Sequence, residues 1–497
     1  MRQRITLFHR NEHGIDPADL KIGDHSLVGP HLTAVREHRV TLALDELPAE
    51  LQELLRDTHE LHIRWSSLRS HEYLGPWASR LPPGLHVFYT PSKGDVAKSG
   101  KLCAQLRVTF GDIDCSSPDE SFTELPHDRF SHSTAYQYFQ SMDSISPFLT
   151  YTEQYACTPA DSRCRAWVEG LSNAVSVDFS YDTISHVVKV TALWPEGRHA
   201  LDFDSRLGHR TEIGILTPDT PPHLEPHELG VTGLLTVLRE DKQPSPVLFS
   251  FPSRHQDMRY GFSSAILQPQ GLHPSLQIKL DSARPPLENA HCAPHTYLTL
   301  PRTIFADKYQ LDDELFLASK NITALRYVSQ PVDLEAPDYA MKLWGSTILL
   351  ELQPPSEQFD QPWTAEIPLH LRYLLPEAGG YKSINVPYPS VFWACAAEDG
   401  TKFPNNPFDR VNLGYDGLFG PRTLFWHVTP KSQNVDTPSH QVRVPVLDLD
   451  KSSWISAGTS AVVILGFAFV VMKLLSLYLR TGYGAKASAK QQEKKKQ

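Results

Sequence analysis

The sequence predicts a mainly β fold, with two antiparallel β-sandwich-like domains followed by one C-terminal transmembrane helix. Apolar and polar residues alternate along many short segments, which is the period of a half-buried strand. Proline accounts for 40 of the 497 residues, above the usual ~5%, and disfavours long helices as the bulk of the fold. One apolar stretch near the C-terminus is long enough to cross a bilayer.

The expected strands occur along almost the whole chain and are separated by proline and glycine. They lie at residues 40–44, 106–110, 175–181, 188–194, 276–280, 348–352, 367–373 and 442–446. The clearest helical pattern outside the membrane segment covers residues 45–61, where Leu51, Leu54 and Leu55 share one face. We expect this helix to connect two strands.

The length of the chain and the distribution of its prolines predict several domains. A chain of 497 residues exceeds one ordinary domain of ~100–200 residues. Prolines crowd between Pro218 and Pro246, where the strand period fades. The expected order is a β-rich domain (1–215), a Pro-rich connecting region (216–259), a second β domain (260–447), a juxtamembrane segment (448–454), a transmembrane helix (455–479) and a basic tail (480–497).

The expected transmembrane helix satisfies the length requirement, because about 20 apolar residues cross a hydrocarbon core of ~30 Å. Trp454 and Tyr478 are suited to the two membrane interfaces. We expect Lys473 to anchor the end of the span; the alternative is a polar contact with a partner helix. Small residues permit close packing against another helix, but they also occur in ordinary lipid-facing composition. These residues are Gly458, Ala461 and Gly466.

The charges that flank the apolar segment predict its orientation. Arg480 and several lysines follow it, and the positive flank of a membrane helix stays in the cytosol. Residues 1–447 are then expected in the lumen of the endoplasmic reticulum, without a cleaved signal peptide, since the first residues lack an apolar h-region. Lys494 and Lys495 resemble the dilysine retrieval signal of endoplasmic reticulum membrane proteins; a plain lysine-rich end is the alternative. We therefore expect a single-pass protein of that membrane with a lumenal N-terminus and a cytosolic C-terminus.

The cysteines and one glycosylation sequon also favour an oxidising, lumenal compartment. Six cysteines are an even number without a metal-type CxxC pair, which fits disulfides, although a reduced cytosolic chain could carry the same count. Fifteen pairings of six cysteines are open. Asn321 begins the sequon Asn321-Ile-Thr323, which is glycosylated only on the lumenal side. The candidate disulfide residues are Cys103, Cys115, Cys157, Cys164, Cys292 and Cys395.

Residues suited to catalysis are few and poorly spaced. The acidic loop 112–120 lacks the spacing of an EF-hand, and the stretch from His291 to His295 contains a proline and has no matching second half. The segment 261–265 lacks the last glycine of a nucleophile elbow. We expect no catalytic residue, metal, cofactor or small-molecule substrate. A net charge of −10 without a concentrated basic face also argues against nucleic acid.

Three segments, taken in order, resemble the PIG-X family. They are the stretch from Leu300 to Leu311, the stretch from Pro368 to Tyr373 and the stretch from Pro387 to Cys395. The match is clearest over residues 270–450, and the long N-terminal extension with a C-terminal span looks like the fungal Pbn-type branch. This resemblance implies an accessory protein of GPI mannosyltransferase I in the endoplasmic reticulum membrane. Such a protein binds and stabilises the multispanning catalytic subunit, which adds the first mannose to the GPI-anchor precursor.

The resemblance also implies, more loosely, help with the folding of other lumenal proteins, and it transfers no catalytic residue. Two other classes stay open at this point: a lumenal chaperone or glycan-binding receptor that acts independently, and a lumenal enzyme anchored by one helix. One disulfide is offered as a specific hypothesis, because a Cys292–Cys395 bridge would close a loop of about 100 residues and contribute ~4–5 kcal/mol in the chain-entropy model.

Overall fold

The computed structural model describes most of the 497 residues. Its description leaves out residues 11–14, 70–76, 78–79, 127–134, 159, 206–207, 226, 269–270, 289, 330–332, 358, 399–405, 407, 409–413, 432–438 and 482–497. The fold is mainly β, as the sequence predicts, with several sheets and one long apolar helix at the C-terminal end of the described chain.

The N-terminal half of the chain builds one sheet of 12 strands, whose order is β12-β11-β10-β1-β3-β9-β8-β4-β5-β7-β6, with β2 paired to β3. Its pairs are antiparallel except for β1 with β10. Strands β3 and β9 are 18 residues long each and pair along most of their length. The strands are β1 (Arg2–Phe8), β2 (Lys21–Ile22), β3 (Ser26–Ala43), β4 (Thr58–Ser66), β5 (Gly84–Pro91), β6 (Thr123–Glu124), β7 (Tyr136–Gln140), β8 (Ser176–Asp182), β9 (Val187–Asp204), β10 (Arg210–Asp219), β11 (Glu228–Val237) and β12 (Ser245–Pro252).

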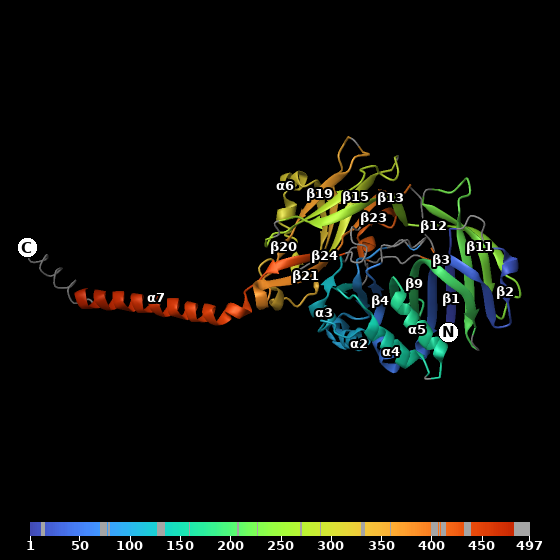
Figure 1. The fold of residues 1–497 in the computed structure, drawn as a ribbon, viewed down its shortest axis with the longest axis horizontal. Coiled ribbons are helices and arrows are strands. Elements are labelled where there is room, and N and C mark those ends of the chain that lie inside the picture. Colours follow the sequence, from blue (N-terminus) through green and yellow to red (C-terminus); the bar gives the residue numbers. More distant parts are fainter. Residues whose placement is uncertain are drawn as a thin grey trace, which may run out of the picture. The chain divides into compact units, whose positions relative to one another are not determined.

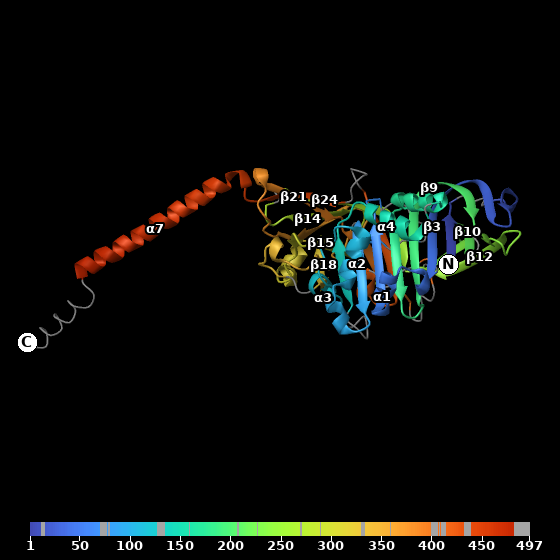
Figure 2. The ribbon, with the colours of Figure 1, turned by 90° about the horizontal axis from the view of Figure 1, so that it is seen from below.

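Short helices cover one face of this sheet, as Figure 1 shows for α2 and α4 and Figure 2 shows for α1 as well. The apolar side chains of these helices share one core with β4, β5 and β9, in which Leu55, Leu106 and Val188 are buried almost completely. The helices of this part are α1 (Ala49–Arg56), α2 (Lys101–Phe110), α3 (Pro118–Ser121), α4 (Ser146–Ala156) and α5 (Ser162–Gly170).

Two sequence expectations change in this region. The strand expected at residues 106–110 is wrong, because these residues belong to helix α2. Leu106 and Phe110 are buried at helical spacing, whereas Val108 between them is 62% exposed. The helix expected at residues 45–61 is shorter, since α1 ends at Arg56 and β4 begins at Thr58.

The second sheet has eight strands in the order β17-β18-β15-β22-β23-β13-β14-β19. It is antiparallel apart from the pair of β13 and β23. Helix α6 (Glu314–Ser319) precedes the edge strand β17. The strands are β13 (His255–Ile266), β14 (Ser275–Leu280), β15 (Cys292–Pro301), β17 (Ile322–Val328), β18 (Gly345–Leu352), β19 (Trp363–Pro368), β22 (Ser390–Ala396) and β23 (Thr423–Pro430).

Contacts between Cα atoms divide the chain into two units. The first unit contains residues 1–373 and 383–442, and so holds both large sheets together with the pair β16 (Ile304–Phe305) and β20 (His370–Leu371). The second unit contains residues 374–382 and 443–497, including helix α7 (Ser452–Thr481). Strands β21 (Tyr381–Pro387) and β24 (Ser439–Pro445) form a two-stranded sheet at the points where the chain passes from one unit to the other.

The expected connecting region at residues 216–259 contains regular structure. Strands β11 and β12 lie inside it and extend the 12-stranded sheet. Two of its prolines, Pro246 and Pro252, are in the edge strand β12, where a sheet tolerates them. The division into two β domains stays a prediction.

Candidate functional site

Helix α7 is the first candidate for a functional contact. It exposes apolar side chains around its whole circumference: Val462 and Phe467 are 70% exposed each, and Leu479 is 80% exposed. It is the only helix in the described part of the chain that is long and apolar enough to cross a membrane. Its 30 residues span about 45 Å at a rise of 1.5 Å per residue. Lipid or other apolar helices are the surroundings in which such a surface is stable.

The small residues of α7 are available for packing. No side chain or neighbouring backbone lies within 4 Å of the place where a Cβ would sit on Gly458 or Gly466. Ala461 lies about 60° from Gly458 around the helix and Gly466 about 80° on the other side, at 100° per residue. The three residues therefore share one broad face, and their contact with a partner helix stays a prediction. The predicted dilysine residues, Lys494 and Lys495, lie outside the described residues.

A strand edge is the second candidate contact. Strand β12 lies at one edge of the 12-stranded sheet and presents Leu248, which is 68% exposed. Such an edge carries backbone donors and acceptors that a strand from another protein could pair with. Pro246 and Pro252 lack an N–H group, which limits the number of bonds the edge could form.

The structure joins all six cysteines in three disulfides. The bridge of Cys292 and Cys395 links two residues that oppose each other on β15 and β22, with Cα atoms 4.1 Å apart. The bridge of Cys157 and Cys164 links the end of α4 to α5. The third bridge joins Cys103 on α2 to Cys115 in the acidic loop.

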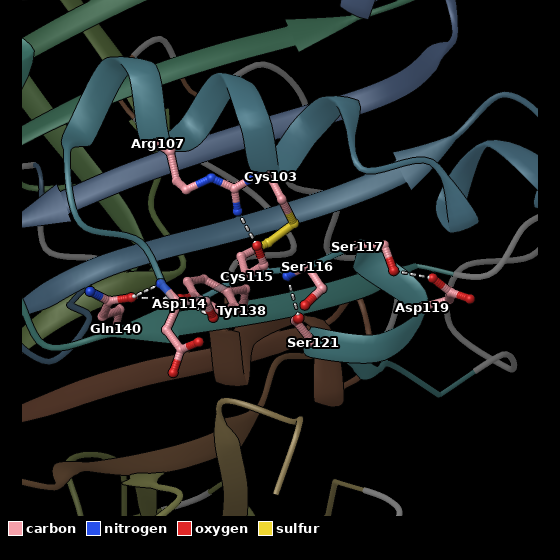
Figure 3. Close-up of a disulfide and its surroundings, with 10 residues drawn as sticks. All are labelled: Cys103, Arg107, Asp114, Cys115, Ser116, Ser117, Asp119, Ser121, Tyr138 and Gln140. Carbon is pink, nitrogen blue, oxygen red and sulfur yellow. Dashed lines mark hydrogen bonds between the residues drawn. A yellow bond between two sulfur atoms is a disulfide. The ribbon is translucent and has the colours of Figure 1, made fainter.

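Figure 3 shows the acidic loop around Cys115 held by local hydrogen bonds. Arg107 of α2 donates to the carbonyl oxygen of Cys115, and the backbone N–H of Asp114 donates to Gln140 Oε1 at 3.0 Å. The carboxylate of Asp114 pairs with Arg302, and that of Glu120 pairs with Lys342. Asp114 and Glu120 thus face cations, and the described residues contain no group of three or more potential metal ligands.

The predicted sequon residue Asn321 occupies a structural position. Its φ of 56° lies in the left-handed region, which asparagine adopts more readily than most residues. Its Nδ2 donates to the carbonyl oxygen of Thr364 at 2.8 Å, and Lys320 Nζ lies 2.7 Å from the carboxylate of Glu366. Strands β17 and β19 are the two edges of the eight-stranded sheet, so these contacts connect both ends of that sheet. The side chain of Asn321 is exposed, and its glycosylation stays a prediction.

Of the remaining residues with catalytic potential, His295 and Ser264 lie in strands. His295 of β15 is buried, with Nδ1 2.9 Å from the carbonyl oxygen of Ala293, whereas His291 is exposed. Ser264 lies in the extended strand β13, without the sharp turn of a nucleophile elbow. Its Oγ is 2.9 Å from His440 Nε2, and burial lowers the pKa of His440 to about 4.

One buried polar cluster has no counterpart in the sequence expectations. Arg254 pairs with Asp416 at 2.8 Å, and His255 Nδ1 lies 3.0 Å from His427 Nε2. Burial lowers the pKa of His427 far below its ordinary value. The cluster joins β13, β23 and the segment before β23, and its contacts hold these segments together inside the fold. Arg254 and Asp416 are far apart in the sequence and belong to no motif, so no sequence signal could have found them.

The comparisons with known proteins agree on one family. The model of the family described as PIG-X / PBN1 matches residues 269–475, which include the eight-stranded sheet from β14 onward and most of α7. Protein pbn1 of Neurospora crassa is 54% identical over 97% of each chain, and Protein PBN1 of Gibberella zeae is 44% identical over 100% of each chain. Protein PBN1 of Yarrowia lipolytica is 26% identical, again over 100% of each chain. The chain belongs to the PIG-X / PBN1 family.

Proposed function

We propose that this protein is a non-catalytic accessory subunit of GPI mannosyltransferase I. In this role it binds the multispanning catalytic subunit, which adds the first mannose to the GPI-anchor precursor, and it stabilises that subunit. Membership of the PIG-X / PBN1 family supports a subunit role in GPI-anchor biosynthesis. The single observation that carries the proposal further is α7, a long apolar helix exposed on all sides and attached to a large folded β unit.

The physical basis is preferential binding of the folded partner. A subunit that binds the folded catalytic protein but not its unfolded form stabilises it by about 2.7 kcal/mol when present at 100 times the dissociation constant. A single span provides a lateral contact through small residues such as Gly458 and Gly466. The exposed edge of β12 provides a second, lumenal contact in this proposal.

The proposed location is the endoplasmic reticulum membrane, with the β unit in the lumen and the C-terminus in the cytosol. Arg480 and the lysines that follow α7 support this orientation, because positive flanks stay cytosolic. The three disulfides support it as well, because such bonds persist in an oxidising compartment. The retrieval role of Lys494 and Lys495 and the glycosylation of Asn321 belong to the same proposal. Help with the folding of other lumenal proteins is a looser part of it.

The test replaces α7 with an unrelated apolar helix of equal length and captures the full chain from membranes in mild detergent. The natural chain should bring down a multispanning mannosyltransferase in stoichiometric amount, and the chain with the exchanged helix should lose it. Membranes that contain only the exchanged form should also transfer less of the first mannose. An unchanged disulfide pattern and melting temperature show that the exchanged form is folded. Full capture by the exchanged form, or mannose transfer by the purified chain alone, contradicts the proposal.

A further inference from the structure

A cavity of about 830 Å³ lies within the first unit, between the 12-stranded sheet and the helices α1, α2, α4 and α5. Figure 1 shows α4 and α5 lying over the long strands of this sheet. The cavity volume falls within the ~300–1,000 Å³ of sites that enclose small molecules. Most of the wall is apolar, formed by side chains such as Leu51, Leu106, Phe110, Phe148, Phe179 and Val190.

Strand β3 supplies one wall through alternate residues. Arg36, His38, Val40 and Leu42 all line the cavity, as expected for one face of a strand. The wall thus changes along the strand from two nitrogen-rich side chains to two aliphatic side chains. A ligand that matches this surface has a polar group at one end and an apolar body.

Arg36 is a cation without an acidic partner. Its guanidinium carbon lies 4.9 Å from the ring centroid of Trp194 and 5.6 Å from that of Phe203, so aromatic faces cover it. Among the described residues no acid forms an ion pair with Arg36, and its buried Nε has no hydrogen-bond partner. Nearby Arg163, in contrast, pairs with Asp204. Burial lowers the pKa of Arg36 from its ordinary value, because it removes water from the cation.

His38 adds a buried donor beside Arg36. Its side chain is nearly inaccessible, with a residue exposure of 5%, and its Nδ1 lies 2.8 Å from Trp167 Nε1. An indole nitrogen only donates, so Nδ1 accepts and the proton of neutral His38 is on Nε2. Burial, with a smaller effect of the Arg36 charge, lowers the pKa of His38 to about 3, which keeps the ring neutral. Within the described structure Nε2 has no partner, and an unpaired buried donor is costly.

We propose that this cavity binds a single-chain amphiphile with an anionic headgroup. Arg36 and the Nε2–H of His38 hold the carboxylate or phosphate, and the acyl chain lies between the helices and the sheet. A guanidinium with unused donors matches both kinds of anion, because its planar fork binds two oxygens at once. The proposal is independent of the role proposed for α7.

The experiment uses the full chain in nanodiscs of zwitterionic lipid and a photoactivatable fatty acid as the probe. After illumination, labelled peptides are identified by mass spectrometry. Labels are expected on α2 and α4, which line the cavity. Competition by oleate alone identifies a carboxylate ligand, competition by lysophosphatidic acid alone identifies a phosphate ligand, and competition by both supports the shared chemistry. Competition by zwitterionic lysophosphatidylcholine to the same extent contradicts an anionic site.

Matched variants locate the headgroup. Arg36→Met keeps an apolar stem but removes the charge. It should raise the anion concentration needed for half-maximal competition about tenfold, the size expected for a lost charge-assisted hydrogen bond. Arg198→Met removes an exposed arginine from β9 outside the cavity and should behave as the natural chain does. Thr152→Trp places a large side chain in the cavity from α4 and should remove labelling of α2.

The melting temperature and the non-reducing disulfide pattern show whether each variant is folded. If Arg36→Met does not fold, the competition series on the natural chain and the Thr152→Trp variant still decide the outcome. Labels confined to α7, unchanged competition in folded Arg36→Met, or displacement only by an apolar peptide would overturn the proposal.

Discussion

At the scale of single residues, Asn321 combines a structural and a chemical role. Its side-chain amide connects the residue before β17 to Thr364 of β19, and the same nitrogen is the predicted attachment point of an N-glycan. A glycosylated amide keeps one N–H group, so a glycan and this hydrogen bond are compatible. The sequence predicted the sequon, but the hydrogen bond depends on a residue 43 positions later and had no local signal.

Two variants separate these roles. Thr323→Ala should remove one glycan from the protein made in a eukaryotic cell and lower the free energy of unfolding only slightly, by about 0.5 kcal/mol, because it loses the long hydrogen bond from Thr323 Oγ1 to the carbonyl oxygen of Leu352. Asn321→Ala should remove the same glycan and also lower the free energy of unfolding by about 1–2 kcal/mol, because it loses a hydrogen bond and places alanine at a positive φ. Gel mobility with and without endoglycosidase reports the glycan, and urea unfolding of the deglycosylated proteins reports stability. Equal stability of the two variants contradicts the structural role.

Buried histidines give the protein a predictable dependence on pH. Burial lowers the pKa of His86 and His440 to about 4 from an ordinary value of 6.5. Between pH 6.5 and 4 the unfolded chain therefore binds protons that the folded chain does not bind. Stability is full above pH 6.5 and falls as the pH drops toward 4, by about 1.4 kcal/mol per pH unit for each such group.

The measurement is the free energy of unfolding at several pH values between 7.5 and 4.5. His440→Asn should reduce the slope of the free energy of unfolding against pH by the contribution of one histidine, about 1.4 kcal/mol per pH unit. His25→Asn, which changes an exposed residue, should leave the slope unchanged. A stability that rises on acidification through this window would be inconsistent with neutral buried histidines.

At the scale of elements, alternation of apolar residues predicted most strands, including those at residues 175–181 and 276–280. It failed at 106–110, where three apolar residues in alternate positions fit a strand as well as a helix. Cys103 and Leu106, one helical turn apart, are both buried, which favours a helix over a strand here. Their burial comes from packing on the sheet beneath α2, which the local sequence does not show. The prolines of residues 216–259 predicted a connecting region without strands. An edge strand tolerates proline, but that β12 is an edge strand is known only from the order of the complete sheet.

The disulfides should differ in their contribution to stability. The bridge of Cys292 and Cys395 spans 103 residues, whereas that of Cys157 and Cys164 spans 7. In the chain-entropy model the first contributes about 4–5 kcal/mol and the second less than about 3 kcal/mol. Replacing each pair with two alanines and measuring urea unfolding compares the two bridges directly. Equal losses, or alkylation of Cys292 and Cys395 without reductant, would contradict this expectation.

Helix α7 permits a test of its small residues. Gly458→Ile together with Gly466→Ile should weaken capture of the catalytic partner about fivefold, since bulk at these positions keeps another helix at a distance. Ser456→Ile with Ser460→Ile adds apolar bulk on the opposite face of the same helix, about 160° and 200° from Gly458 at 100° per residue, and serves as the control. If both double variants capture the partner equally well, the small residues belong to an ordinary lipid-facing surface.

At the scale of the whole molecule, the sequence predicted a mainly β protein with one apolar helix, because composition, period and a long apolar run are local properties. The family was predicted from the resemblance of three segments to PIG-X. The cavity behind β3 could not be predicted in this way. Its lining joins Arg36 to Phe148, which are 112 positions apart, and neither residue belongs to a recognisable motif. The same holds for the strand edge of β12, which is defined only by the order of the complete sheet.

Protection from protease in sealed microsomes tests most directly the claim that the β unit is held in the lumen by α7. With an epitope placed before β1 and another after Thr481, added protease should remove only the second epitope and leave a fragment of nearly full length. Dissolving the membrane with detergent should then expose the β unit to digestion. Loss of the first epitope while the microsomes are sealed would contradict the orientation and, with it, the proposed partnership in the lumen.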